Sequence, residues 1–291
     1  MMHRSAFLVI FSAMKRSTLS WILSAAITVA AAWYQRATGP THPLPGSYAL
    51  GDRHQGYELP RSHTTGTDCV VAVPVPDTLA RGILMWRHFP SSEAWRREVM
   101  VNSGGMLSTR LPDQPPAGHL EYAVMIQSGG SWAVLPSRET AVIRFKGEVP
   151  LLVLIPHILA MFLAMLLSTR TGLACFDGTA YVKPFIGWTI GFLVLGGFVL
   201  GPLVQRAAFG SYWTGWPAGS DLTDPKTLFA LVLWLFAALA VWRFRNPRRW
   251  VAVAATALLL VYLIPHSALG SRLEYGTALP QSTPETKKTP P

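Results

Sequence analysis

The stretch VPLLVLIPHILAMFLAMLLS, residues 149–168, has His157 as its only ionisable side chain. A helix rises about 1.5 Å per residue, so about 20 apolar residues cross the hydrocarbon core of a bilayer, which is about 30 Å thick. Apolar runs this long are typical of membrane-spanning helices rather than of buried helices in soluble proteins. The stretch therefore predicts a transmembrane helix.

Further apolar runs repeat this pattern. Residues 184–203 contain no charged side chain, and residues 227–242 and 250–269 lie on either side of a short basic turn. A shorter apolar run covers residues 19–33. The composition agrees, because 50% of the residues are hydrophobic and 14% are charged, which is unusual for a soluble protein. We expect an α-helical transmembrane bundle of about five spans, in contact with a lipid bilayer.

The run at residues 19–33 has two interpretations. It follows Lys15 and Arg16 and ends near three alanines, which are features of a cleaved signal peptide. The same residues also fit an uncleaved membrane anchor. We take the run as an anchor in the organisation described below, and the sequence of the mature N-terminus would separate the two interpretations.

Basic residues in short loops indicate the orientation of the chain, because such loops resist translocation and stay on the cytoplasmic side. The turn RFRNPRR, residues 243–249, is strongly basic, and Arg170 and Lys183 flank the loop after the 149–168 run. With a cytoplasmic N-terminus, five spans alternate consistently with these loops. Residues 34–148, the Trp-rich loop YWTGW at 212–216 and the C-terminal tail are then external.

The external segment alternates short β-type runs with turn residues. Asn-Ser-Gly-Gly at 102–105 and Ser-Gly-Gly-Ser at 128–131 are suited to hairpin turns. Alternation and turn spacing of this kind predict an all-β sandwich. The candidate strands are residues 69–75, 83–87, 98–101, 106–110, 120–127, 132–135 and 141–145.

These seven runs, with the stretch LPDQPPAGHLEYAVMI at 111–126, resemble immunoglobulin and fibronectin type III modules over about a third of the chain. The chain as a whole resembles bacterial polytopic inner-membrane proteins that carry an external domain of this kind. The resemblance implies an inner-membrane location with a periplasmic β domain. Because such modules usually bind or space other molecules, we expect a non-enzymatic accessory or assembly protein with a membrane or periplasmic protein partner.

The expected organisation has five parts, with a helical anchor first and a tail last. They are residues 1–33 (N-terminal region and first anchor), 34–66 (external linker), 67–148 (β-sandwich), 149–269 (four-helix transmembrane domain) and 270–291 (disordered external tail).

The net charge of +10 does not indicate nucleic-acid binding. Residues 34–148 contain 11 basic and 10 acidic side chains, so the excess lies elsewhere, mostly at the margins of the apolar runs. This distribution is typical of topology signals and of contacts with anionic lipid headgroups. No catalytic triad, phosphate loop or paired-carboxylate motif occurs in the sequence, so an enzyme is the class with least support.

A repeated step provides the candidate site. The sequence Leu-Ile-Pro-His occurs at 154–157 and again at 263–266, and each copy places a histidine near the expected external boundary. An ionisable side chain at membrane depth is costly and usually faces a partner or a cavity. The Trp-rich loop is expected on the same side. The candidate residues are therefore His157, His266, Trp213, Trp216 and Asp221.

Neutral imidazole is a good ligand for haem iron or a transition metal. Two external histidines with a Trp-rich loop resemble the haem-handling proteins of cytochrome c maturation, which implies a cofactor at His157 and His266. A quinone would suit the same groups. Two alternatives remain: each histidine bonds a carbonyl freed by its neighbouring proline while the tryptophans form an interfacial belt, or Asp221 and His157 line the path of a small transporter.

Overall fold

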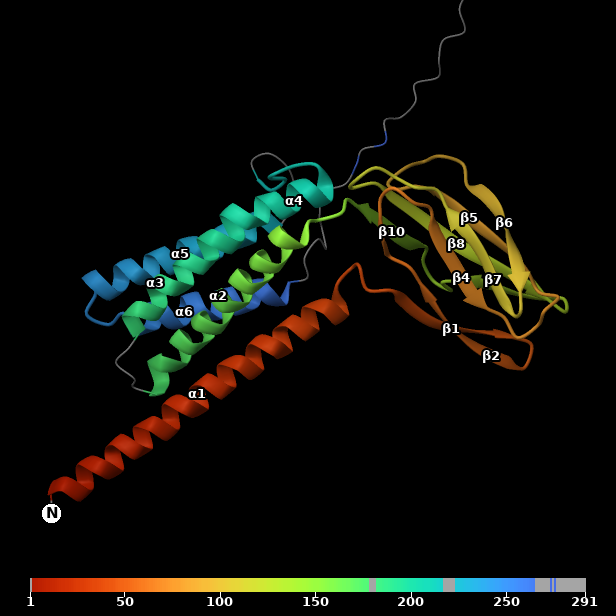
Figure 1. The fold of residues 1–291 in the computed structure, drawn as a ribbon. Coiled ribbons are helices and arrows are strands. Elements are labelled where there is room, and N and C mark those ends of the chain that lie inside the picture. The colour runs from red at the N-terminus through yellow and green to blue at the C-terminus, as the bar shows by residue number, and fades with distance from the viewer. Residues whose placement is uncertain (1, 178–181, 217–222, 265–272, 274, 276–291) are drawn as a thin grey trace, which may run out of the picture.

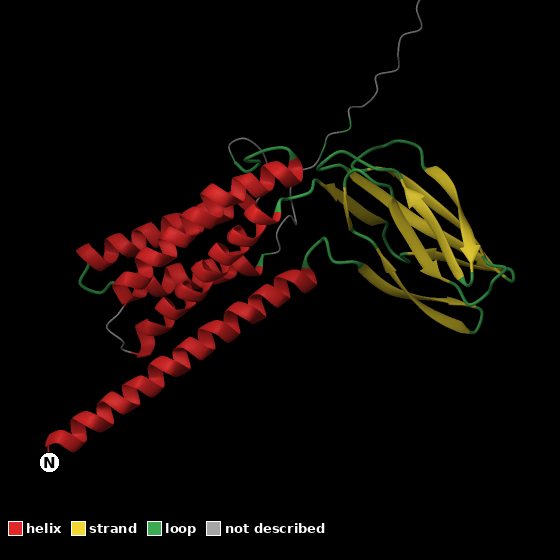
Figure 2. Cartoon of the chain, in the orientation of Figure 1, coloured by secondary structure: helices red, strands yellow, loops and turns green. Residues whose placement is uncertain are grey.

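The computed structural model describes residues 2–177, 182–216, 223–264, 273 and 275. Within this part of the chain the helices and the strands are separated in space (Figures 1 and 2). The helices form a bundle, and the strands form a domain at one end of it, here called the β domain. The chain passes from the first helix into the β domain and returns to the bundle for the remaining helices.

The bundle contains one long N-terminal helix and a group of helices that follows the β domain. One of them, from Val182 to Phe209, continues without a break through a π-helical segment. The elements are α1 (Met2–Thr38), α2 (Leu151–Asp177), α3 (Val182–Leu193), the π-helical segment η1 (Val194–Leu200), α4 (Gly201–Phe209), α5 (Thr223–Arg243) and α6 (Arg248–Leu263).

Four helical stretches of the described chain are long and apolar enough to cross a membrane. They are Arg16–Thr38, Leu151–Phe176, Lys183–Phe209 and Asp224–Arg243. This agrees with the apolar runs in the sequence. The described helix α6 has 16 residues, and the remainder of the expected span at 250–269 lies outside the described residues. A fifth span therefore stays a prediction.

Small side chains bring the helices of the bundle close together, with Trp234 of α5 as the largest fully buried side chain. Ala164 of α2 and Ala237 of α5 are fully buried beside it in one apolar cluster. Gly172 of α2 lies so close to α6 that a Cβ atom there would be 2.7 Å from the Cβ of Ala255. Small residues at such contacts allow helix backbones to approach in the way that membrane helices do.

The β domain is built from ten strands. Eight form one nearly closed sheet in the order β3-β10-β8-β5-β6-β7-β4, with β9 paired to β8, and β1 and β2 form a separate hairpin. The strands are β1 (Leu44–Leu50), β2 (Arg53–Leu59), β3 (Ser62–Thr64), β4 (Cys69–Pro74), β5 (Arg81–His88), β6 (Arg96–Ser103), β7 (Met106–Leu111), β8 (His119–Ser128), β9 (Ser131–Leu135) and β10 (Ala141–Lys146).

Strand β6 connects the two halves of this sheet, because it pairs with β5 along one part and with β7 along the other. Its residues Arg96 to Met100 pair with β5, and Val101 to Ser103 pair with β7. Strands such as β4 and β5 alternate buried residues with more exposed ones, and the buried side chains of the domain form a single core that includes Leu84, Tyr122 and Phe145. All seven candidate strands are present as β4 to β10, so the prediction of an all-β domain is confirmed.

Residues 34–66 differ from the linker that we expected. Helix α1 continues to Thr38, and strands β1, β2 and β3 follow it. Tyr48, Leu50, Tyr57 and Leu59 of the hairpin are buried in the core of the β domain, and the Tyr48 hydroxyl donates to the carbonyl of Pro74 at 2.6 Å. Glycine residues in both strands weaken the sequence signal for this hairpin. Gly46 is needed because a Cβ atom there would collide with the ring of Tyr57.

The β domain contacts the bundle where β10 leads into α2. The Gly147 N–H donates to the carbonyl of Ala208 at 2.8 Å. The guanidinium of Arg144 lies 3.8 Å from the ring centroid of Phe209, at the end of α4. These contacts fix the β domain against the ends of the helices that hold the candidate site.

Candidate functional site

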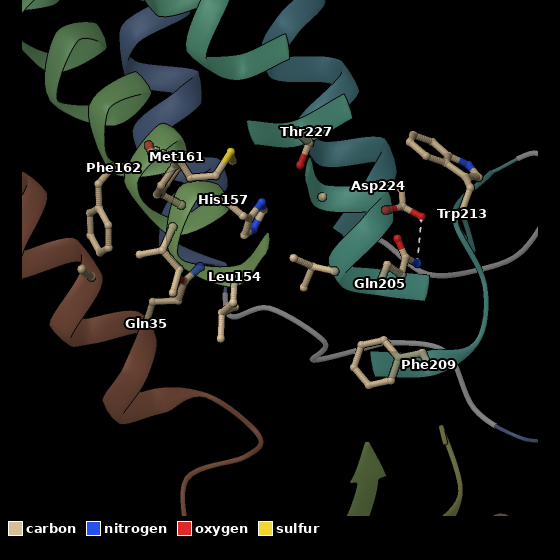
Figure 3. Close-up of a pocket in the computed structure, with 16 residues that line it drawn as sticks. Gln35, Leu154, His157, Met161, Phe162, Gln205, Phe209, Trp213, Asp224 and Thr227 are labelled. Atoms are coloured by element: carbon tan, nitrogen blue, oxygen red, sulfur yellow. Dashed lines mark hydrogen bonds between the residues drawn. The ribbon is translucent and has the colours of Figure 1, made fainter. Parts of the chain in front are cut away.

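A cavity of about 370 Å³ lies between the helices near the β domain (Figure 3). Its walls come from α1, α2, η1, α4, α5 and α6 and from the loop after α4. Most of the lining is apolar, as in many small-molecule sites. Its polar side chains are His157, Gln35, Gln205, Asp224, Thr227, Tyr262 and Trp213.

His157 is held on α2 by a contact with the π-helical segment. Its Nδ1 atom lies 2.9 Å from the carbonyl oxygen of Gly196. Because a carbonyl only accepts, Nδ1 must carry the proton, and in a neutral ring Nε2 then carries a lone pair. No hydrogen bond to Nε2 forms with any residue that the structure describes. His157 thus offers the cavity one hydrogen-bond acceptor or metal ligand.

Glycines of η1 and α4 make this contact possible. A Cβ atom on Gly196 would lie 2.7 Å from the Sδ of Met161, so a larger residue there would require the helices to separate or Met161 to move. The same Gly196 carbonyl also accepts from the N–H of Gly201, five residues later, which is the π-helical pattern. Single π-helical turns are frequent at functional sites. One carbonyl therefore fixes both the local backbone and the imidazole.

Asp224 organises the Trp-rich loop on the opposite side of the cavity. Its Oδ2 atom accepts from the backbone N–H groups of Thr214 and Gly215, each at 2.8 Å. The amide orientation of Gln205 that satisfies its neighbours donates to Asp224 Oδ1 at 3.1 Å and accepts from the Thr214 hydroxyl. The carboxylate, which is 9% exposed, is thus supplied with donors by the protein itself. Its position favours a structural role in holding the loop against α5.

The two tryptophans of the loop have different positions. Trp213 lines the cavity, its ring stacks on Phe198 with centroids 6.3 Å apart, and its indole N–H donates to the Trp216 carbonyl at 3.3 Å. The side chain of Trp216 is 74% exposed and does not line the cavity. The structure therefore brings Trp213, but not the Trp216 side chain, together with His157.

The other two candidate residues, His266 and Asp221, lie outside the described residues. Ile264, directly after α6, lies near the cavity. Its carbonyl accepts from the Lys226 ammonium at 2.9 Å and from Gln35 at 3.4 Å, and Gln35 lines the cavity.

One alternative from the sequence is wrong for His157. A proline at position 156 frees the carbonyl four residues earlier, that of Leu152. His157 instead bonds the carbonyl of Gly196, which is far away in the sequence. The imidazole therefore connects two helices and does not satisfy the carbonyl that Pro156 leaves free in its own helix.

Sequence reasoning missed most residues of the cavity, among them Gln35, Met161 and Tyr262. Gln35 falls in a segment that we took for a linker, and Met161 has no distinguishing signal in an apolar run. Tyr262 carries a detectable signal, because it is a polar residue in an apolar span. Its hydroxyl donates to the Met161 carbonyl at 2.5 Å and connects α6 to α2.

The described part of the cavity does not bring together the ligands of a metal site, and His266, the second predicted ligand, lies outside it. Among the described residues, no three His, Cys, Asp or Glu side chains lie together as a metal site.

Comparison of the chain with models of known protein families, with curated proteins and with solved structures finds no match. The fold and the cavity together define a helical bundle of membrane-spanning length, with an all-β domain at the end that holds a small-molecule cavity.

Proposed function

We propose that the chain is a multi-span membrane protein that binds a small, mostly apolar molecule in the cavity between its helices. The observation that carries this proposal is the geometry of His157. Its Nδ1–H is bound to the Gly196 carbonyl, which leaves Nε2 available in an apolar cavity. Metal and cofactor sites fix histidine in the same way, through a second contact that sets the tautomer.

Membrane insertion is supported by the outer surface of the bundle. Large apolar side chains are exposed on several helices, such as Leu152 (89%), Trp188 (61%) and Leu239 (53%). Contiguous apolar surface of this kind is costly in water and favourable in lipid. We further propose the bacterial inner membrane, with the basic turn at 243–249 and the N-terminus cytoplasmic and the β domain periplasmic.

The proposed orientation places the cavity near the external boundary of the membrane. His157 lies in the second turn of α2, and α2 begins directly after the β domain. Phe209 lines the cavity and also contacts Arg144 of the β domain. A ligand in the cavity would therefore lie next to the part of the protein that faces the periplasm.

A second function is favoured by a different observation. Four apolar side chains lie exposed on the outer face of β4, β6 and β7: Val70 (54%), Val99 (78%), Val101 (67%) and Met106 (41%). The strand register places them on one side of the sheet. Exposed apolar patches often mark protein contacts. We propose that this face binds a membrane or periplasmic protein, as an accessory or assembly protein would, and that the domain is related to immunoglobulin and fibronectin type III modules.

The test of the proposed function is analysis of the small molecules that purify with the protein. The full chain is extracted in detergent, and its organic extract and absorbance spectrum are compared for wild type, His157→Ala and Leu159→Ala. Leu159 is on the same helix and is 56% exposed, so it serves as a matched control. We expect a stoichiometric molecule in wild type and Leu159→Ala that is lost in His157→Ala. Equal amounts in all three proteins would overturn the proposal.

A further inference from the structure

The hydrogen-bonding capacity of the cavity limits the chemistry of its ligand. Nε2 of His157 accepts, because Nδ1 holds the only proton of the neutral ring. Three other polar groups of the lining each use a donor within the protein. The Tyr262 hydroxyl donates to Met161, the Trp213 indole to Trp216, and the Gln35 amide to Ile264.

Gln205 and Asp224 are also satisfied. The Gln205 amide donates to the Asp224 carboxylate, which in addition accepts two backbone N–H groups. Thr227, the remaining polar side chain of the lining, has an interaction elsewhere in the protein. At His157 the cavity thus presents an acceptor, whereas the donors of Tyr262, Trp213 and Gln205 are used within the protein. A ligand that brings its own donor is matched to it, because a donor left without a partner in an apolar site is costly.

The charge of the lining restricts the ligand further. No lysine or arginine is among the described residues that line the cavity. The Lys226 ammonium, which is bound to the Ile264 carbonyl beside Gln35, does not line the cavity, so an anionic headgroup or the carboxylates of a haem would meet no lysine or arginine side chain within it, and burying an unpaired charge is strongly unfavourable. A neutral ligand is favoured.

The side chains that line the cavity favour a ligand with an aromatic ring. Trp213 and Phe162 provide aromatic surface, and Met161 provides a polarizable thioether that packs well against aromatic rings. Phe162 is 39% exposed and Ile158 is 40% exposed, so part of the lining on the flank of α2 reaches the outer surface of the bundle. In the proposed membrane setting this flank faces lipid, so a lipid-soluble molecule can enter with an apolar tail left outside.

We propose, on the basis of the cavity function above, that the ligand is a lipid-soluble aromatic ring with a hydroxyl group, of the quinol class, whose O–H donates to Nε2 of His157. The corresponding quinone lacks this donor and offers only carbonyl acceptors. Two acceptors facing each other do not bond, so the reduced form binds more tightly than the oxidised form. The site therefore selects by redox state through one hydrogen bond, and no electron transfer is required for this selection.

The test uses a matched pair of probes, tetramethylhydroquinone and its dimethyl ether, which share the ring but differ in the hydroxyl donors. Binding to the full chain in detergent is measured without oxygen by quenching of tryptophan fluorescence. We expect wild type to bind the hydroquinone about five- to tenfold more tightly than the ether, as one hydrogen bond at this site predicts. The preference should vanish in His157→Ala, persist in Leu159→Ala, and persist in part in His157→Gln, whose amide oxygen still accepts.

The outcomes separate this inference from the proposed function. Equal binding of the two probes to wild type would overturn the hydroxyl inference while the cavity function stands. A co-purified haem band that depends on His157 would also overturn the hydroxyl inference while the cavity function stands, because it would identify a different ligand class. Failure of both probes to bind, with no co-purified molecule, would overturn both proposals. Circular dichroism and gel filtration of each variant establish that it is folded. If His157→Ala does not fold, His157→Gln takes its place in the test.

Discussion

The Nδ1 atom of His157 lies 2.9 Å from the carbonyl oxygen of Gly196, and this carbonyl also closes the π-helical turn to Gly201. One backbone oxygen therefore sets the protonation pattern of the imidazole and the path of the helix that faces it. The contact joins two of the helices that are long enough to cross a membrane, and it directs a single acceptor toward the cavity between them.

Replacing Gly196 should disturb this contact. In Gly196→Ala, the new Cβ atom would lie 2.7 Å from Met161 Sδ and 3.2 Å from Ala160 Cβ, so the helices must separate or Met161 must move. Overpacking of this kind costs about 1–3 kcal/mol. The matched control is Gly187→Ala, because a Cβ atom at Gly187 has nothing within 4 Å. Thermal unfolding in detergent should show a lower midpoint for Gly196→Ala and an unchanged or higher one for Gly187→Ala.

The loop after α4 should depend on the charge of Asp224. In Asp224→Asn, one oxygen is replaced by an NH2 group, which faces the donors of Thr214, Gly215 or Gln205. We expect a loss of about 1–3 kcal/mol, because a buried donor is left without an acceptor. Limited proteolysis should cut the variant between residues 210 and 222 faster than wild type. Asp52→Asn, on an exposed turn, is the control, and equal cleavage of both variants would contradict the role of Asp224.

The β domain should lose stability at high pH through Tyr48. Burial raises the pKa of Tyr48 from 10.0 to about 12, because the phenolate is poorly solvated in the core. A folded-state pKa above the unfolded value means that the neutral phenol contributes its full stability below about pH 10 and loses it as the pH rises toward 12. Tyr48→Phe removes the bond to Pro74 and should cost about 0.5–1.5 kcal/mol at pH 8.

Melting temperatures of both proteins at pH 8 and pH 11 test this prediction. The deficit of Tyr48→Phe should shrink between these two values. A deficit that stays constant would mean that the pKa of Tyr48 is the same in the folded and the unfolded state.

The proposed topology can be tested with single cysteines. The chain has two native cysteines, and Cys69→Ala with Cys175→Ser gives a cysteine-free background. Leu79 is 84% exposed in the β domain, and Asn246 lies in the exposed turn between α5 and α6. A maleimide that cannot cross the membrane should label Leu79→Cys on intact spheroplasts and Asn246→Cys only after they are lysed. The opposite pattern would reverse the orientation.

Part of the fold was predictable because its signals are local. Long apolar runs, such as those that contain His157 and Trp234, indicated four of the helices. Alternation with Gly-rich turns indicated strands β4 to β10. The hairpin β1-β2 was missed, since Gly46 and Gly56 interrupt both strands and its residues gain their stability from packing on the core. Local patterns do not carry such contacts.

The site was predictable only in part. An imidazole in an apolar run marked His157, and the Trp-rich loop marked Trp213. The sequence could not indicate that Gln35 and Tyr262 line the same cavity, because they reach it from helices at opposite ends of the chain. Nor could it indicate the π-helical turn, whose carbonyl selects the tautomer of His157 through a contact 39 residues away.

The most direct measurement of the central claim is the ¹⁵N spectrum of the His157 ring in histidine-labelled protein, with His157→Gln used to assign the signals. The account predicts a neutral ring near pH 8, with the proton on Nδ1 and an unprotonated Nε2. On addition of tetramethylhydroquinone, the Nε2 signal should shift as it accepts a hydrogen bond, and the dimethyl ether should leave it unchanged. A ring protonated on Nε2, or an Nε2 signal that neither compound alters, would contradict the account.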